Sequence, residues 1–151
     1  MQGVDHFDPS GLTALVLDDN HYERGISVDQ LRAMGFGRAI GVSNTLEAWE
    51  TVRLVNPNVI LMDWLNSGGG DGLEFARRIR KSDDAPNRAV AMFMLTTRAA
   101  TANVELARRA GVDGYLRKPV SVLALQQRVK TVINNPQPFV MTSTTSFPTS
   151  S

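Results

Sequence analysis

Three aspartates follow apolar runs in this sequence, at positions where buried strands would end. Asp18 and Asp19 close the run in "ALVLDDN", and Asp63 closes the run in "NVILMDW". Two adjacent negative charges destabilise a buried strand, so the pair Asp18 and Asp19 needs a chemical explanation. Carboxylates that are packed together repel one another and are driven toward their protonated forms unless a cation joins them. The pattern therefore predicts a cation site at the strand ends.

Mg²⁺ is the cation that suits such a site, because it binds a few carboxylates, keeps several waters and leaves room for a phosphate oxygen. Two further groups follow later apolar runs: Thr96, whose hydroxyl can donate to a phosphoryl oxygen, and Lys118, whose ammonium adds a mobile positive charge. This inventory is typical of phosphoryl transfer, in which positioning and charge neutralisation supply most of the catalysis. Asp63 is the expected nucleophile because it stands alone on a central strand, while Asp18 and Asp19 are placed to hold the metal.

The elements that must position these groups alternate between apolar strands and helices. Strand patterns cover residues 14–18, 38–42, 59–62, 89–95 and 114–116, and helical patterns begin near residue 20 and cover 44–55, 73–80, 103–110 and 122–133. Asn44, with Glu47 three positions later, predicts a capping box at the second helix. The strands are apolar throughout, as in a parallel sheet that is covered on both faces. The order therefore predicts an α/β fold, in which loops after the strands form the binding crevice.

Composition limits the class of protein. The chain has 151 residues, a hydrophobic fraction of 42%, a net charge of +1 and no cysteine. The charge balance suggests no direct nucleic-acid binding and no acidic membrane partner, and the missing cysteine excludes disulfides and thiolate metal sites. There is neither a secretory signal nor an apolar stretch approaching the roughly 18 residues of a membrane span. We expect a soluble, cytoplasmic protein.

The chain divides into three parts by composition. Residues 1–11 are expected to be a flexible lead-in, and residues 12–133 carry all the strand and helix patterns. Residues 134–151 are rich in serine, threonine and proline, have no charge and show no period, so a flexible tail is expected.

The four motifs "LVLDDN", "VILMDW", "MLTT" and "GYLRKPV", in that order, resemble the response-regulator receiver domain of two-component signalling, the CheY-like family. The spacings agree with that family, since Asp63 follows Asp19 by 44 positions and Lys118 follows Thr96 by 22. The resemblance covers about residues 12–133. It implies a five-stranded parallel sheet of order 2-1-3-4-5 flanked by five helices, a flavodoxin-like three-layer sandwich.

The resemblance also implies a role for each residue of the site. Asp63 would accept a phosphoryl group from a sensor histidine kinase or a histidine phosphotransfer protein. Asp19 and Asp63 would bind Mg²⁺ directly and Asp18 mostly through water, with the main-chain carbonyl of Leu65 as a further ligand. Lys118 would contact the phosphoryl group, and the peptide bond that follows it would be cis.

A switch is the implied output of this chemistry. Thr96 would move toward the phosphoryl group, and Tyr115 would follow into the vacated space. That movement would remodel the face formed by the fourth helix, fifth strand and fifth helix, where partners read the state. The protein would be a phosphoacceptor with self-phosphorylation and self-dephosphorylation only, not an enzyme acting on other substrates, and a monomer or a phosphorylation-dependent dimer. We expect a stand-alone regulator, with a linker to an output domain as the alternative for the tail.

Two departures from the family pattern leave a rival function open. The residue after the switch threonine is Thr97, which is bulkier than usual, and the loop "LNSGGGDG" is longer and richer in glycine, which could loosen the Leu65 carbonyl. The rival is a receiver-like adaptor that works without phosphorylation. A Mg²⁺-dependent phosphatase would need a second aspartate two positions after Asp63, where Leu65 stands, and a flavodoxin would need a phosphate-cradling loop in place of "DDNHYE".

Overall fold

The computed structural model describes residues 7–64, 71–83, 85, 88–97 and 101–134. Within these ranges the chain forms a short 3-10 helix, five strands and five α-helices. In chain order they are η1 (Pro9–Gly11), β1 (Thr13–Leu17), α1 (His21–Ala33), β2 (Arg38–Val42), α2 (Thr45–Val55), β3 (Val59–Met62), α3 (Gly72–Lys81), β4 (Ala91–Thr96), α4 (Thr101–Arg109), β5 (Gly114–Arg117) and α5 (Val122–Asn134).

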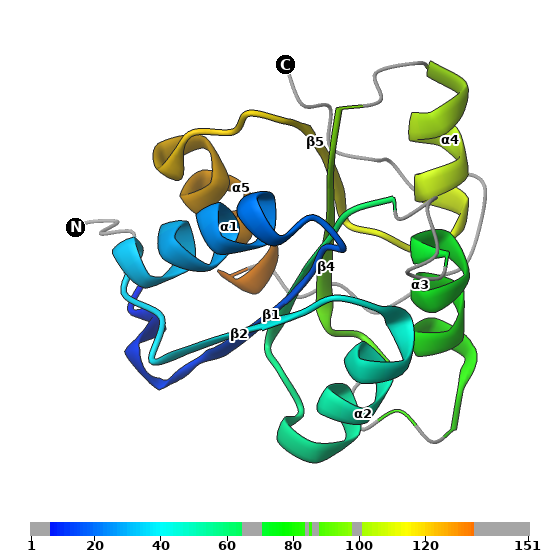
Figure 1. The fold of residues 1–151 in the computed structure, drawn as a ribbon, viewed down its shortest axis with the longest axis horizontal. Helices are drawn as coiled ribbons and strands as arrows, with labels where there is room; N and C mark the ends of the chain where they lie inside the picture. The colour runs from blue at the N-terminus through cyan, green and yellow to red at the C-terminus, as the bar shows by residue number, and fades with distance from the viewer. Residues whose placement is uncertain (1–6, 65–70, 84, 86–87, 98–100, 135–151) are drawn as a thin grey trace.

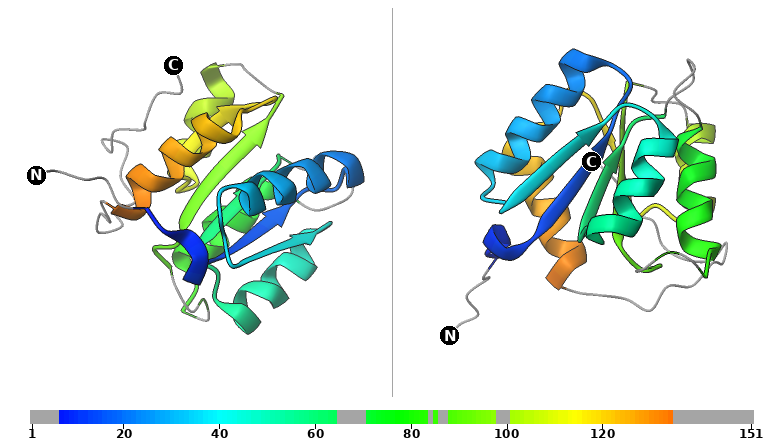
Figure 2. Two further views of the ribbon diagram at one scale, coloured as in Figure 1. Left: turned by 90° about the vertical axis from the view of Figure 1, so that its left-hand side faces the viewer. Right: turned by 60° about the horizontal axis from the view of Figure 1, so that its bottom comes forward.

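The strands form one parallel sheet in the order β2-β1-β3-β4-β5, as the family resemblance implied. The register sets Leu17 of β1 beside Val42 of β2 and Met62 of β3, and Met94 of β4 beside Tyr115 of β5. Because all the strands point the same way, the residues that follow them gather at one edge of the sheet (Figure 2). The fold is the expected flavodoxin-like three-layer sandwich.

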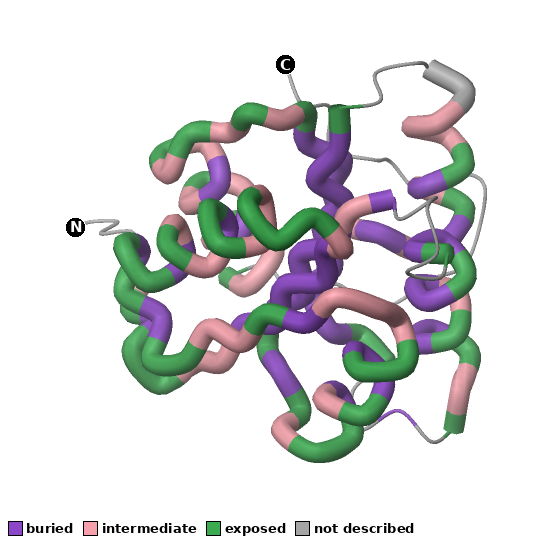
Figure 3. The backbone as a smooth tube through the Cα atoms, in the orientation of Figure 1, coloured by how far each residue is buried: buried purple, intermediate pink, exposed green. Residues whose placement is uncertain are grey.

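The helices cover both faces of the sheet, α1 and α5 on one side and α2, α3 and α4 on the other (Figure 1). Two apolar cores result. Leu31 of α1 and Val129 of α5 pack with one set of strand side chains, while Trp49 of α2 and Phe75 of α3 pack with the other set. The strands other than β2 are buried almost throughout, as Figure 3 shows by their purple colour, whereas the edge strand β2 is buried only at Val42. This burial on both faces explains why the strand sequences show no apolar–polar alternation.

Polar side chains define where the helices begin. Asn20 accepts a hydrogen bond from the Glu23 amide at the start of α1, and Asn44 accepts one from the Glu47 amide at the start of α2. The capping box predicted for Asn44 is only half formed, because the Glu47 carboxylate accepts from the Ser43 amide (3.1 Å) rather than from the amide of Asn44. The Ser43 hydroxyl also donates to the Glu47 carboxylate (3.2 Å), so that carboxylate is held at Ser43, one residue before the predicted partner Asn44.

The predicted ranges 38–42 and 59–62 match β2 and β3, and the bounds of the other three strands differ from the sequence patterns by one or two residues. β1 ends at Leu17, so Asp18 lies outside the strand although its amide still donates to the Val42 carbonyl (3.1 Å). β4 begins at Ala91 instead of residue 89 because the Val90 carbonyl accepts a hydrogen bond from the Arg80 side chain (2.7 Å). None of the helices in the described part of the chain has the length and apolar character needed to cross a bilayer.

Candidate functional site

Asp18 and Asp63 are side by side because β1 and β3 are neighbours in the sheet. The Asp63 amide donates to the Leu17 carbonyl (2.9 Å), which fixes the residue that follows β3 next to the residue that follows β1. Asp19 continues from Asp18 into the loop before α1. The three carboxylates each offer one oxygen within 4.8 Å of the others. The sheet therefore joins residues that the sequence separates by more than forty positions.

The chemistry of this cluster suits a hard divalent cation. All three donors are carboxylate oxygens, the ligand type that Mg²⁺ prefers. Asp18 is 2% exposed, whereas Asp19 and Asp63 are partly exposed, so the site is open to solvent on one side. One oxygen of the buried Asp18 is also held by the neighbouring backbone, since Oδ1 accepts a hydrogen bond from the Asn20 amide (2.9 Å). Helix capping does not explain the acidic pair, because the N-cap of α1 is Asn20.

Lys118 reaches this cluster from the end of β5. Its amide donates to the Thr96 carbonyl (2.9 Å), which holds it beside the end of β4, and the bond to Pro119 is cis, as the resemblance implied. The Nζ atom lies 2.8 Å from Asp18 Oδ2 and 3.5 Å from Asp63 Oδ1. The ammonium thus lies between two carboxylates that come from different strands.

Burial and nearby charges raise the pKa of both Asp63 and Lys118, but for different reasons. Burial raises the pKa of Asp63, and the negative charge of Asp18 raises it further, although the Lys118 ammonium opposes both effects. For Lys118, burial by itself lowers the pKa, but the hydrogen bonds to Asp18 and Glu23 and the nearby carboxylate charges outweigh it, so the pKa is raised. The site therefore holds a firmly charged ammonium next to a carboxylate that is costly to ionise.

The two expected switch residues lie on the α4 side of the sheet. Thr96 is the last residue of β4 and is 2% exposed, and Tyr115 of β5 is 3% exposed. Tyr115 pairs with Met94, and strand alternation turns the Thr96 side chain to the same face as Met94. By contrast, Thr97 is exposed and lines a pocket next to Lys118.

The loop after β3 is described only at its two ends. Leu65, whose carbonyl was expected to bind the metal, lies outside the described residues. On the near side Trp64 is buried, and on the far side the Gly72 amide donates to the Trp64 carbonyl (3.1 Å). A Cβ atom on Gly72 would lie 2.5 Å from the Asp63 carbonyl oxygen. Glycine is therefore required at this position, where α3 begins against the end of β3.

Sequence reasoning missed one charged residue of the site, Glu23. This residue lies in the first turn of α1, and its Oε1 atom is 2.5 Å from Lys118 Nζ. Its position three residues after the helix cap Asn20 is typical of a capping box, so the sequence offered an ordinary explanation for it. Its partner is 95 positions away, and only the tertiary structure, which brings the start of α1 next to the segment after β5, shows the pair.

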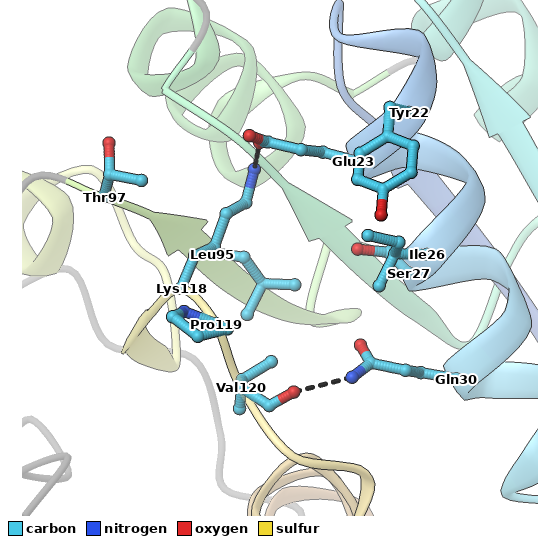
Figure 4. Close-up of a pocket in the computed structure, with 10 residues that line it drawn as sticks. All are labelled: Tyr22, Glu23, Ile26, Ser27, Gln30, Leu95, Thr97, Lys118, Pro119 and Val120. Carbon is cyan, nitrogen blue, oxygen red and sulfur yellow. Dashed lines mark hydrogen bonds and ion pairs between the residues drawn. The ribbon is translucent and has the colours of Figure 1, made fainter.

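A pocket of about 300 Å³ lies between α1 and the segment that follows β5. Figure 4 shows Tyr22, Glu23 and Ile26 of α1 around it, with Lys118 and its neighbours opposite. Tyr22 and Ile26 are 76% and 42% exposed, so this side of the pocket is open to solvent. Lys118 and Glu23 thus line an open, partly apolar hollow next to the carboxylate cluster.

Comparisons with known proteins agree with this geometry. The family model described as "Response regulator receiver domain" matches residues 14–130. "Chemotaxis protein CheY1" of Helicobacter pylori is 28% identical over 120 residues, which span 79% of this chain and 94% of that protein. The "Chemotaxis protein CheY homolog" of Campylobacter jejuni is 29% identical over 123 residues, 79% of this chain and 90% of that protein. A "putative response regulator from Chloroflexus aurantiacus" matches in structure with a TM-score of 0.74 and 25% identity, covering 82% of this chain and 98% of that one.

Proposed function

Because the chain belongs to the response regulator receiver family, we propose that it is a phosphorylatable switch whose phosphoacceptor is Asp63. The family accepts phosphoryl groups in two-component signalling, and this chain retains the residues needed to do so. The observation that carries the proposal is the convergence of Asp18, Asp19, Asp63 and Lys118 at one edge of the sheet.

Mg²⁺ is the cofactor of this proposal. Asp19 and Asp63 would bind it directly and Asp18 mainly through water, with the Leu65 carbonyl as a further ligand. When bound, Mg²⁺ neutralises the carboxylates and polarises the phosphoryl oxygens. The donor set of three carboxylates within 4.8 Å supports this choice of ion.

The residues of the chain then divide the work of phosphoryl transfer. An Asp63 oxygen attacks phosphorus while the phosphorus–nitrogen bond of the donor phosphohistidine breaks, and the electron pair of that bond returns to the imidazole. Lys118 is held beside Asp63, where its ammonium can neutralise the phosphoryl oxygens. The Thr96 hydroxyl would donate to the same group, and burial of both Thr96 and Tyr115 makes their rearrangement a discrete packing event.

The donor would be a sensor histidine kinase or a histidine phosphotransfer protein. The readout would be the face formed by α4, β5 and α5, which lies next to Tyr115. We include in the proposal a cytoplasmic location, no direct nucleic-acid binding, and a monomer or a phosphorylation-dependent dimer. The near-neutral charge of +1 supports the absence of a nucleic-acid partner.

Intact-protein mass spectrometry tests the phosphoacceptor. After incubation with acetyl phosphate and Mg²⁺, we expect the wild-type chain to gain the mass of one phosphoryl group, because acetyl phosphate can replace the phosphohistidine donor. The gain should require Mg²⁺ and should disappear in Asp63→Asn, which keeps the size of the side chain. A wild-type chain that gains no mass would favour the phosphorylation-independent adaptor, and a gain that survives in Asp63→Asn would place the phosphoryl group elsewhere.

A further inference from the structure

We propose that Glu23 is a positioning residue that restrains the Lys118 ammonium and thereby slows phosphorylation of Asp63. The proposal rests on the proposed function and concerns its rate. Glu23 lies on a different element from the metal-binding candidates and forms no part of their cluster.

The contact geometry makes Glu23 a direct competitor for Lys118. A lysine ammonium has three N–H donors and no acceptor. In the structure these donors face Glu23 Oε1 at 2.5 Å and Asp18 Oδ2 at 2.8 Å, while Asp63 Oδ1 is more distant at 3.5 Å. The dashed contact in Figure 4 shows the lysine side chain extended toward Glu23. Of these three carboxylates, Asp63 therefore makes the longest contact with the Lys118 ammonium.

A bound cation would sharpen this competition. Asp18 and Asp63 belong to the carboxylate cluster that suits a cation, so part of their negative charge would be neutralised there. Glu23 is outside that cluster and would keep its full charge toward Lys118. Its oxygen is also within about 6 Å of Asp63 Oδ1, because both lie close to the same nitrogen. At that separation Glu23 repels an incoming phosphoryl dianion as well as occupying the ammonium.

The backbone around Lys118 is anchored independently of Glu23. Gln30, two turns further along α1, donates from Nε2 to the Val120 carbonyl (2.6 Å), as Figure 4 also shows. This bond joins α1 to the chain two residues after Lys118. Loss of Glu23 is therefore expected to release the lysine side chain and to leave the segment that carries it in place.

The test compares Glu23→Gln, which keeps the shape without the charge, with Glu23→Met, which removes the acceptor as well. In the transfer from acetyl phosphate an Asp63 oxygen bonds to phosphorus and acetate leaves with the electron pair. At saturating Mg²⁺ we expect both variants to be phosphorylated about three- to tenfold faster than the wild type, since a repelling charge and a competing acceptor are lost. Asp29→Asn removes a charge from the exposed face of the same helix and should leave the rate unchanged.

A second readout needs neither metal nor phosphoryl group. The sequence contains only three lysines, Lys81, Lys118 and Lys130, so lysine-selective ¹⁵N NMR can follow each ammonium. Held by two carboxylates, the Lys118 ammonium should exchange its hydrogens slowly in the wild type and faster in Glu23→Gln. The Lys118→Arg variant assigns the signal.

The outcomes separate this inference from the phosphoacceptor proposal. Faster phosphorylation together with faster hydrogen exchange at Lys118 supports the role of Glu23. If the wild type is phosphorylated on Asp63 but both Glu23 variants react within twofold of its rate, the proposed restraint by Glu23 is wrong. The proposal that Asp63 is the phosphoacceptor is then still supported. Unchanged hydrogen exchange in Glu23→Gln also overturns the restraint. A wild type that is never phosphorylated overturns the proposed function itself.

Discussion

Asp63 is the proposed phosphoacceptor, and its burial also makes it a source of instability in the metal-free protein. Burial raises its pKa and the Asp18 charge adds to that effect, against the opposing attraction of Lys118. A carboxyl group whose pKa is higher in the folded chain than in the unfolded chain binds more protons when folded. Stability is therefore lost as the pH rises from the unfolded pKa through the folded pKa, and at neutral pH the ionised group is a net cost. Under the proposed function this cost is unavoidable, because the same ionised carboxylate would be the nucleophile.

Removing that charge should stabilise the metal-free chain. At pH 7 in EDTA we expect Asp63→Asn to melt about 1 to 4 °C above the wild type, and the difference should disappear at a pH below the unfolded pKa of Asp63. Added Mg²⁺ should raise the melting temperature of the wild type more than that of the variant, because the proposed site needs the Asp63 carboxylate. Differential scanning calorimetry measures both effects. An Asp63→Asn variant that melts lower than the wild type at pH 7 would show that pairing with Lys118 outweighs burial.

At the scale of the elements, the position of α3 depends on one buried arginine. The Arg80 side chain is 1% exposed, and it donates to the carbonyls of Gly111 (2.9 Å), Arg88 (2.8 Å) and Val90 (2.7 Å) and to Asp113 Oδ2 (3.0 Å). These bonds tie the end of α3 to the segments before β4 and before β5. The positive φ of Gly111 (97°) belongs to the same arrangement, since a Cβ there would lie 2.7 Å from the Arg80 side chain. The anchor lies away from the residues of the site.

Replacement of this arginine should be costly. We expect Arg80→Met to lower the free energy of unfolding by about 3 kcal/mol, because buried carbonyl groups and the Asp113 carboxylate lose their partner. Arg77→Met on the same helix removes an exposed ion pair with Glu74 (3.7 Å) and should cost less than about 0.5 kcal/mol. Urea denaturation of both variants gives the comparison. Equal losses in the two variants would mean that the buried network does not anchor α3.

At the scale of the whole molecule, stability comes from two apolar cores that share one sheet. α5 is essential to one of them, since Leu125 and Val129 are 0% exposed against the strands. The flexible lead-in expected for residues 1–11 is wrong from Phe7 onward, because Phe7 packs edge-on against Phe36 and Pro9 is buried in η1. We propose that the folded unit ends near residue 133 and that the residues after it form a tail. Helix α5 ends at Asn134, within one residue of that boundary.

Truncation tests this division. A chain that ends at Asn134 should melt within about 2 °C of the full chain and should be phosphorylated at the same rate, because both cores and the site remain. A chain that ends at Ser121 lacks α5 and should fail to fold. Calorimetry and the acetyl phosphate assay measure the two properties. A fall of more than about 5 °C in the first truncated chain would show that residues 135–151 pack on the domain.

The sequence by itself determined the fold class and the position of the site. Apolar runs and the polar residues that end them are local patterns, so the five strands and the candidates Asp18, Asp19, Asp63 and Lys118 could all be predicted. Since parallel strands end at one edge of a sheet, knowing the strands was enough to bring those residues together. Even the ends of most helices could be predicted, because caps are made by neighbours in the chain.

Only the tertiary structure decided which distant side chains pair. In the sequence Glu23 resembled an ordinary capping residue, and Arg80 resembled Arg77 and Arg78 on the same helix, which are more exposed in the structure. Glu23 contacts Lys118, and Arg80 is buried and pairs with the partly exposed Asp113, because of how α1 and α3 are rotated against the sheet. That rotation depends on the packing of whole apolar faces, which no local sequence pattern records.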